Sequence, residues 1–267
     1  MQFPAFIETT VMLTSRKTPQ PFGMTMHRPV KILGPFKLLI AAVVAAVLCA
    51  APPTSLKAQN PPTDREVQVY AGLHAAAASG DVAEIERLLM EGENPNLQDA
   101  NSRTPLLVAT YRKHHKAAEA LLKGGANPNA RDLQRFDMLT ITVTQNDIEM
   151  LKLGLANGAS ARNVTGQSNA TALISAAHLG YVEFVKLLID AKAPVDHVNA
   201  MGWTALITAV VLGNGSKEHV ATVEALVKGG AEVEIKDRRG TTALGHARQR
   251  GYSDMIRILE AAVSRKT

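Results

Sequence analysis

Apolar residues recur along most of this chain at a spacing that predicts short amphipathic helices in pairs. After Thr171, an alanine-rich segment is followed by Val182, Val185, Leu188 and Ile189, which are three and four residues apart. This is the spacing of one face of an α-helix, whereas a half-buried strand would alternate apolar and polar residues. A threonine hydroxyl before the first segment can cap a helix N-terminus. The pattern therefore predicts two short helices joined by a turn.

The same pattern returns in six units. They begin at Ala71, Thr104, Asp137, Thr171, Thr204 and Thr242. The first three starts are 33 residues apart, the next interval is one residue longer, and the last interval is five residues longer than the period. Recurrent motifs are a T-P-L or T-A-L opening, an AA-x-x-G stretch, a V-x-x-LL segment and a closing G-A-x-x-N. Such helix pairs bury their apolar faces by stacking on their neighbours.

From about Val67 to Ala262, the order and spacing of these motifs resemble the ankyrin-repeat family. The resemblance implies an all-α ankyrin solenoid of about six helix–turn–helix repeats with β-turn fingers. The second helices should end in left-handed residues at Gly92, Gly125, Gly158 and Gly230. The fourth repeat has Lys192 in that place, and because this conformation costs a non-glycine residue about 1 kcal/mol, we expect its turn to be reshaped.

The N-terminal region has a different pattern. Basic residues at 28, 31 and 37 precede an unbroken apolar run from Leu38 to Ala51, which Pro52, Pro53 and the small residue Ala58 follow. This order is typical of a secretory signal peptide, with cleavage expected after Ala58. A membrane anchor is the alternative, but the run is shorter than the ~20 residues needed to span a bilayer.

These observations divide the chain into four parts. We expect an upstream segment and signal peptide at 1–58, with Met1, Met24 and Met26 as alternative starts. A linker at 59–66, the repeat domain at 67–262 and a C-terminal tail at 263–267 follow. Polar arginines in the last repeat fit a solvated terminal cap.

The net charge of +5 arises in the N-terminal segment. Residues 1–58 hold six of the 29 basic residues and one of the 24 acidic residues, so 23 of each remain in the rest of the chain. The predicted mature protein is therefore neutral, and no nucleic-acid partner is expected.

Cys49 is the only cysteine and lies inside the apolar run. Lipid attachment there is an alternative to plain cleavage, but Leu48 precedes it where a small residue would be expected. If the signal peptide is removed, the mature chain has no cysteine, which suits an oxidising compartment. We therefore expect a periplasmic or secreted protein that meets the membrane only through its signal peptide.

The family resemblance also implies where a partner protein would bind, namely on the fingers and the inner helices. Carried over by position, the residues free to vary there are Ala100, Asn101, Arg103, Tyr111, Arg112, Leu133, Gln134, Phe136, Thr144, Gln145, Ala170, His178, Leu179, Ala200, Met201, Trp203, Val211, Leu212, Arg238, Arg239, Thr241, Gln249 and Arg250. From this set we select as partner-binding residues Tyr111, Arg112, Leu133, Phe136, Met201, Trp203, Arg238 and Arg239. Trp, Tyr and Arg are enriched among interface hot spots. The alternative for Phe136 and Trp203 is that they pack against neighbouring fingers and stiffen the row.

Catalytic residues, metal ligands and cofactors are not predicted. His114 and His115 are adjacent and diverge by about 100° on a helix, so they do not form a simple metal site. His74 is expected to make structural hydrogen bonds. The insertion in the fifth repeat, Gly213 to Ser216, lacks the spacing of a phosphate-binding loop. A partner-specific loop and neutral drift are its other interpretations.

The sequence thus predicts an exported protein–protein interaction module that steadies or sequesters an exported enzyme. The alternative is a secreted effector that acts on a host protein. A small enzyme or metal binder on the repeat surface is a third, weaker hypothesis, because no convergent polar cluster is seen.

Overall fold

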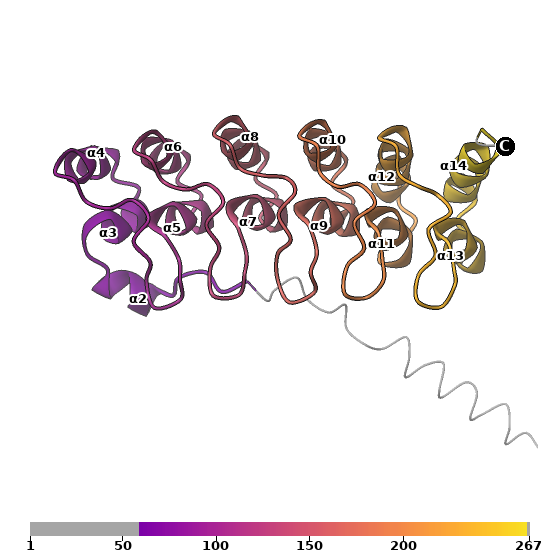
Figure 1. Cartoon of the computed structure of the whole chain (residues 1–267), viewed down its shortest axis with the longest axis horizontal. Coiled ribbons are helices and arrows are strands. Elements are labelled where there is room, and N and C mark those ends of the chain that lie inside the picture. Colours follow the sequence, from indigo (N-terminus) through magenta and orange to yellow (C-terminus); the bar gives the residue numbers. More distant parts are fainter. Residues whose placement is uncertain (1–58, 266–267) are drawn as a thin grey trace, which may run out of the picture. The chain divides into compact units, whose positions relative to one another are not determined.

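The computed structural model describes residues 59–265, and the predicted signal peptide and Cys49 lie outside this range. The helices of the described residues are α2 (Asp64–Val69), α3 (Gly72–Ser79), α4 (Val82–Met90), α5 (Pro105–Tyr111), α6 (His115–Lys123), α7 (Met138–Thr144), α8 (Ile148–Ala156), α9 (Ala172–Leu179), α10 (Val182–Asp190), α11 (Ala205–Val211), α12 (Lys217–Lys228), α13 (Ala243–Arg250) and α14 (Ser253–Ser264). From α3 onward they form six antiparallel pairs that stack side by side, with α3, α5, α7, α9, α11 and α13 as the inner row (Figure 1). The predicted all-α solenoid is confirmed.

Most inner helices begin at a side-chain cap. The Thr104 hydroxyl accepts a hydrogen bond from the backbone N–H of Leu107 at 3.3 Å, and Pro105 occupies the first turn. Thr171, Thr204 and Thr242 cap their helices in the same way. The caps satisfy backbone donors that the first helical turn leaves unpaired, so the repeated threonine fixes where each inner helix starts.

The turn after the outer helix has the same form in all repeats that have a following finger. Gly125 has φ of +89°, and Ala126 N–H donates to the Leu121 carbonyl at 2.9 Å. Lys192 has φ of +64°, and the corresponding bond from Ala193 to Leu188 is also 2.9 Å. The expectation that Lys192 reshapes its turn is therefore wrong, because the backbone hydrogen bonds hold this lysine in the left-handed conformation.

The core lies between the two rows of helices and between neighbouring pairs. Leu106, Leu173 and Leu206 on the inner helices and Leu121 and Leu188 on the outer helices are at most 1% exposed. Alanines between them let the helices approach closely, as in the clusters around α9 and α11. At the C-terminal end, Arg248, Gln249 and Arg250 are exposed, as expected for a solvated cap.

The fingers are the loops that connect each outer helix to the next inner helix. Three contain one isolated antiparallel bridge, for example between Arg131 and Asp137. Four are closed by a buried or nearly buried side chain: Asp132 Oδ1 accepts from the N–H groups of Gln134 and Phe136, and Asp99, Asn199 and Asp237 repeat this arrangement. The fingers are therefore ordered, and their tips can present side chains in fixed positions.

Residues 59–66 are not the simple linker that we expected. Thr63 and Glu66 form a capping box at the start of α2, in which each side chain bonds the other's backbone N–H. The sequence Thr-x-x-Glu before Val67 carries this signal, so the helix was detectable. No helix of the described residues is long and apolar enough to cross a membrane.

Candidate partner-binding surface

An N-terminal strap, residues 59–69, lies against the finger side of the first three repeats. The Thr144 hydroxyl at the end of α7 donates to Gln59 Oε1 at 2.7 Å, and Gln59 Nε2 donates to the Thr140 carbonyl at 3.3 Å. Arg103 donates to the Asn60 carbonyl at 3.2 Å, and Pro62 is buried. In Figure 1 the strap runs from α2 past α5 toward α7. The strap is thus a docked part of the repeat domain.

A buried arginine holds the strap in place. Arg103 is 1% exposed, and its guanidinium donates to Asp99 at 2.7 Å and to Glu66 on α2 at 2.8 Å. Asn101 adds a second bond to the same Glu66 oxygen, at 2.7 Å. We refer to Glu66, Tyr70, Asp99 and Arg103 as the Arg103 cluster. Removing one partner of such a buried ion pair leaves an uncompensated charge, so the cluster ties the strap to the finger between α4 and α5.

The cluster also perturbs the ionisation of its members. The N–H of Thr63, together with Arg103, holds the pKa of Glu66 below its usual value of 4.5. Burial works against ionisation of Asp99, but hydrogen bonds from Tyr70 and Arg103 outweigh it and lower the pKa of this carboxyl below 3.8. Burial and the bond to Asp99 raise the pKa of Tyr70. Both carboxylates are therefore ionised at neutral pH.

Arg103 corrects one expectation from the sequence. The family position before the helix-opening threonine was expected to be free for partner contact, and Phe136, Ala170, Trp203 and Thr241 occupy it in later repeats. In the second repeat the arginine side chain instead faces inward, and its backbone carbonyl accepts a hydrogen bond from His74 Nε2 at 2.9 Å. The expected structural role of His74 is thereby confirmed.

Beyond Gln59 the finger side continues as a groove of about 740 Å³. Its floor is made by α7, α9 and α11, and its wall by the fingers that precede α7, α9 and α11. The lining residues are Gln59, Asn60, Gln134, Phe136, Thr140, Thr165, Gly166, Gln167, Ser168, Ala170, Ile174, Ser175, His178, Asn199, Met201, Thr208 and Leu212. None of these lining residues is Asp, Glu, Lys or Arg. The volume falls in the range of small-molecule and peptide-sized sites, about 300–1,000 Å³.

Two predicted partner-binding residues lie in this groove. Met201 is 41% exposed, and Phe136 is half-buried, with its ring close to Gly166. Gly166 has φ of +64°, and a Cβ there would come within 3.2 Å of the Phe136 ring. Phe136 therefore packs against the neighbouring finger, as the alternative interpretation expected, and it also lines the groove, while its contact with a partner stays a prediction.

Tyr111 is placed differently from the prediction. It is 7% exposed, and its hydroxyl donates to Asp132 Oδ2 at 2.8 Å. Burial, together with the charge of Asp132, raises its pKa. Tyr111 is thus a core residue that fixes the finger between α6 and α7, and the expectation that it forms an accessible contact is wrong. The neighbouring Arg112 is exposed but lies 3.7 Å from Asp64 of the strap.

The remaining predicted residues lie along the fingers. Leu133 is 67% exposed, and Arg238 and Arg239 are exposed on the last finger. Trp203 is half-buried and packs against the core, with its backbone N–H bonded to Asn199 at 3.1 Å. The fingers are joined by backbone hydrogen bonds, as from Leu133 to Asn101 at 2.8 Å. The selected residues therefore form a finger row and a groove, with Tyr111 outside both.

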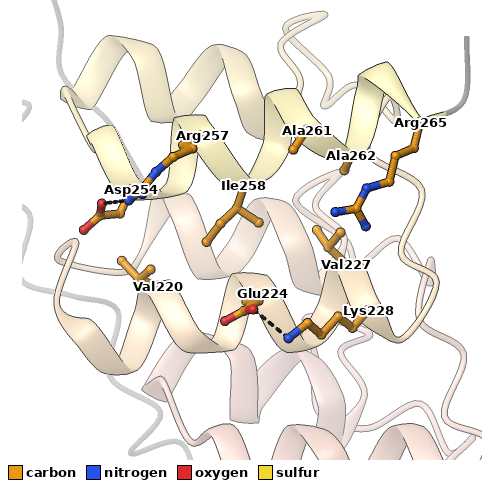
Figure 2. Close-up of a pocket in the computed structure, with 10 residues that line it drawn as sticks. All are labelled: Val220, Glu224, Val227, Lys228, Asp254, Arg257, Ile258, Ala261, Ala262 and Arg265. Atoms are coloured by element: carbon orange, nitrogen blue, oxygen red, sulfur yellow. Dashed lines mark hydrogen bonds and ion pairs between the residues drawn. The ribbon is translucent and has the colours of Figure 1, made fainter.

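A second, smaller groove of about 480 Å³ lies on the opposite, outer-helix side between α12 and α14. Figure 2 shows Val220 and Val227 facing Ile258 across its floor. The ion pairs Glu224–Lys228 and Asp254–Arg257 lie on its rim, each within one helix. These four charges pair locally, whereas Arg265, which also lines the groove, has no salt bridge among the described residues.

Several histidine side chains form hydrogen bonds within the repeat domain. His114 Nε2 bonds the Ala78 carbonyl at 3.1 Å, whereas His115 Nε2 lies 2.8 Å from Asp147, so the adjacent rings serve different neighbours. His246 lies 2.8 Å from Asp237. Within residues 59–265, no group of three or more His, Cys, Asp or Glu side chains is arranged to hold a metal ion.

The insertion of the fifth repeat is attached to the last one. Ser216 caps α12, and the Tyr252 hydroxyl donates to the Gly213 carbonyl at 3.2 Å. Gly215 has φ of +74° and lies against the Tyr252 ring. The loop is therefore held by the terminal repeat, which gives the inserted glycines a structural role.

The geometry defines a helical-repeat scaffold that presents fingers and a groove. A family model for ankyrin repeats (3 copies) matches residues 73–162 and 138–237. These matches cover more than half of the chain, and the chain belongs to the ankyrin-repeat family.

Known proteins agree with this assignment. The chain is 29% identical to the ankyrin repeat protein YahD of Escherichia coli (strain K12) over 188 residues, 70% of this chain and 93% of YahD. An ankyrin repeat domain from Acinetobacter baumannii AYE is 38% identical, with a TM-score of 0.69, covering 71% of this chain and 96% of that chain. A chain from the complex of a predatory endopeptidase of Bdellovibrio bacteriovorus with an immunity protein shares the fold, at 24% identity and a TM-score of 0.60, over 72% of this chain and 98% of that chain.

Proposed function

We propose that this protein is exported and that its ankyrin repeats bind a partner protein through the fingers and the groove. Ankyrin repeats are protein–protein interaction modules, and the proposal adds the compartment and the surface. The observation that carries it is the row of exposed side chains that the scaffold does not need. Leu133 is 67% and Met201 41% exposed on ordered fingers. Large apolar groups in such positions favour association with a partner.

The partner that we favour is an exported enzyme that the protein steadies or sequesters. The Bdellovibrio bacteriovorus chain of similar fold comes from a complex of an endopeptidase with an immunity protein. By analogy, this similarity supports a repeat protein that binds an enzyme. The signal-peptide pattern at Leu38–Ala51 supports an encounter in the periplasm or outside the cell. A secreted effector that acts on a host protein is the second candidate, supported by the same export signal.

Crosslinking in intact cells, followed by affinity capture and mass spectrometry, tests the proposal. The variant Leu133→Asp/Arg238→Glu changes the finger row, and Met90→Asp is its matched control, because Met90 is 82% exposed on an outer helix. We expect capture of a defined partner by the wild type and by the control, and a loss of at least tenfold in the finger variant. Equal capture by all three folded proteins would refute binding by the fingers.

Fractionation then separates the two candidates. Retention of the partner complex in the periplasm supports an enzyme-binding role, whereas recovery in the medium or in a host cell supports the effector. Recovery in the cytoplasm with an uncleaved N-terminus would contradict export.

A further inference from the structure

The groove is the continuation of a channel that already holds a polypeptide. The strap residues Gln59 and Asn60 form its near end, and they are fixed by hydrogen bonds to α7 and to the finger between α4 and α5. The strap itself covers the same finger side over the first three repeats. From Gln59 onward the channel passes over α9 and α11 without any described segment of the chain inside it. The occupied part thus shows the kind of ligand for which this surface is shaped.

The strap also shows how such a ligand is recognised. The side-chain amide of Gln59 accepts a hydrogen bond from the Thr144 hydroxyl and donates one to the Thr140 carbonyl. Arg103 bonds the main-chain carbonyl of Asn60, and Pro62 is buried. Thr63 has φ of −70° and ψ of 158°, which is extended backbone. Gln59, Asn60 and Pro62 are therefore recognised through uncharged groups, and the chain is extended at Thr63, whereas Glu66 further along the strap pairs with Arg103.

The lining of the open part has the same chemical character. It contains no ionised acid or base, and desolvation by burial, with the neighbouring His219, lowers the pKa of His178 so that its ring is neutral at neutral pH. Phe136, Ile174 and Met201 supply apolar contact beside the hydroxyls and amides. A charged ligand would lose its hydration in this lining without gaining an opposite charge.

Thr208 on α11 leaves an unpaired polar atom beside the groove. Its side chain is 1% exposed and lines the groove, yet its hydroxyl has no hydrogen-bond partner. Buried polar atoms are nearly always paired, and an unpaired one destabilises the fold. Gln134 Oε1, also in the lining, is buried and unpaired. A hydroxyl and an amide oxygen in the residues that line the groove are therefore without a partner in the described part of the chain.

We infer that the groove binds an extended, uncharged polypeptide segment of the partner, rich in Asn, Gln, Ser, Thr and small apolar residues, which lies end to end with the strap. This inference rests on the proposed function and deepens it by naming the chemistry of the bound segment. The strap is then an intramolecular occupant of the first part of the channel, and it forms one wall of the site for the second part.

The test is a selection of 12-residue peptides from a random phage-displayed library on the immobilised protein, followed by fluorescence polarisation with the best synthetic peptide. We expect enriched peptides with no net charge. Met201→Glu, which places a carboxylate in the lining, should weaken binding at least tenfold. Thr208→Val keeps the shape but removes the unpaired hydroxyl, and it should weaken binding about 3- to 10-fold, the value of one hydrogen bond.

Thr222→Val is the matched control. Thr222 on α12 is likewise buried with an unpaired hydroxyl but does not line the groove. We expect both valine variants to be at least as stable as the wild type, while only Thr208→Val binds peptide less well. A purely structural role for Thr208 would give equal peptide affinity in both variants and would overturn the inference.

Three other results would also overturn it: no enrichment, enrichment of strongly charged peptides, or binding that Met201→Glu leaves unchanged. The proposed function has a separate outcome. If the cellular partner is still captured by Met201→Glu but lost in Leu133→Asp/Arg238→Glu, protein binding by the fingers stands and the groove inference fails.

Discussion

At the residue scale, Arg103 is the side chain that joins the N-terminal strap to the repeats. It pairs with two carboxylates and bonds a main-chain carbonyl of the strap while being 1% exposed. The residues at the equivalent position of later repeats are apolar or small: Phe136, Ala170, Trp203 and Thr241. A position that the family leaves variable has therefore been used here for an internal contact.

We predict that Arg103→Ala lowers the free energy of unfolding by about 3 kcal/mol, because Asp99 loses its buried partner. Chemical denaturation followed by circular dichroism measures this. Arg239→Ala, at an exposed finger position, should change stability by less than about 0.5 kcal/mol. Equal effects of the two variants would show that the Arg103 cluster contributes nothing to the fold.

The turn residues allow a second prediction at this scale. Gly125→Ala should destabilise the protein by about 1 kcal/mol, although a Cβ there meets nothing within 4 Å, because the cost comes from φ of +89° alone. Lys192→Gly should instead stabilise the protein, because glycine adopts a positive φ without strain. The gain should not exceed about 0.5 kcal/mol, because glycine also raises the conformational entropy of the unfolded chain. Thermal unfolding of both variants checks this, and an unchanged Tm for Gly125→Ala would contradict it.

At the scale of elements, the strap is attached through groups that titrate. The folded-state pKa values of Glu66 and Asp99 lie below 4.5 and 3.8. A lowered pKa means that the stabilisation is fully present above the unfolded-state value and is lost as the pH falls through the folded-state value. The docking of α2 should therefore weaken below about pH 4.5.

We expect Glu66→Gln to reduce protection of the strap amides from hydrogen exchange at pH 7, and the difference from wild type to shrink toward pH 3. As the pH falls through the lowered pKa of Glu66, the wild type loses the negative charge that the glutamine variant lacks at every pH. Glu86→Gln, at an exposed position on α4, is the control and should leave the strap unchanged. A difference that persists at pH 3 would assign the effect to packing.

At the scale of the whole molecule, the stacked repeats share a core in which each helix pair contacts its neighbours. Stability in such a solenoid is a sum of repeat and interface contributions. Leu206→Ala on α11, a residue 1% exposed, should cost about 3 kcal/mol through the cavity that it creates. We expect the loss of hydrogen-exchange protection to be largest from α9 to α14 and smaller in α3–α6. Val198→Ala, 46% exposed, is the control, and a uniform loss along the chain would contradict the nearest-neighbour description.

The sequence by itself determined the number of repeats, the threonine caps and most of the left-handed turns, because each depends on residues within a few positions of one another. It also located the fingers, and Met201 and Phe136 as exposed or lining residues. The charge balance of 1–58 against the rest followed from counting alone.

Only the tertiary structure decided which of the candidate residues are accessible. Tyr111 is buried because Asp132, on the next finger, accepts its hydroxyl, and Arg103 is buried because α2 docks on it. The groove and the strap depend on contacts such as Gln59 with Thr144, which lie 85 residues apart in the chain. Local patterns cannot specify such contacts, since the same finger positions face a neighbour in one repeat and solvent in another.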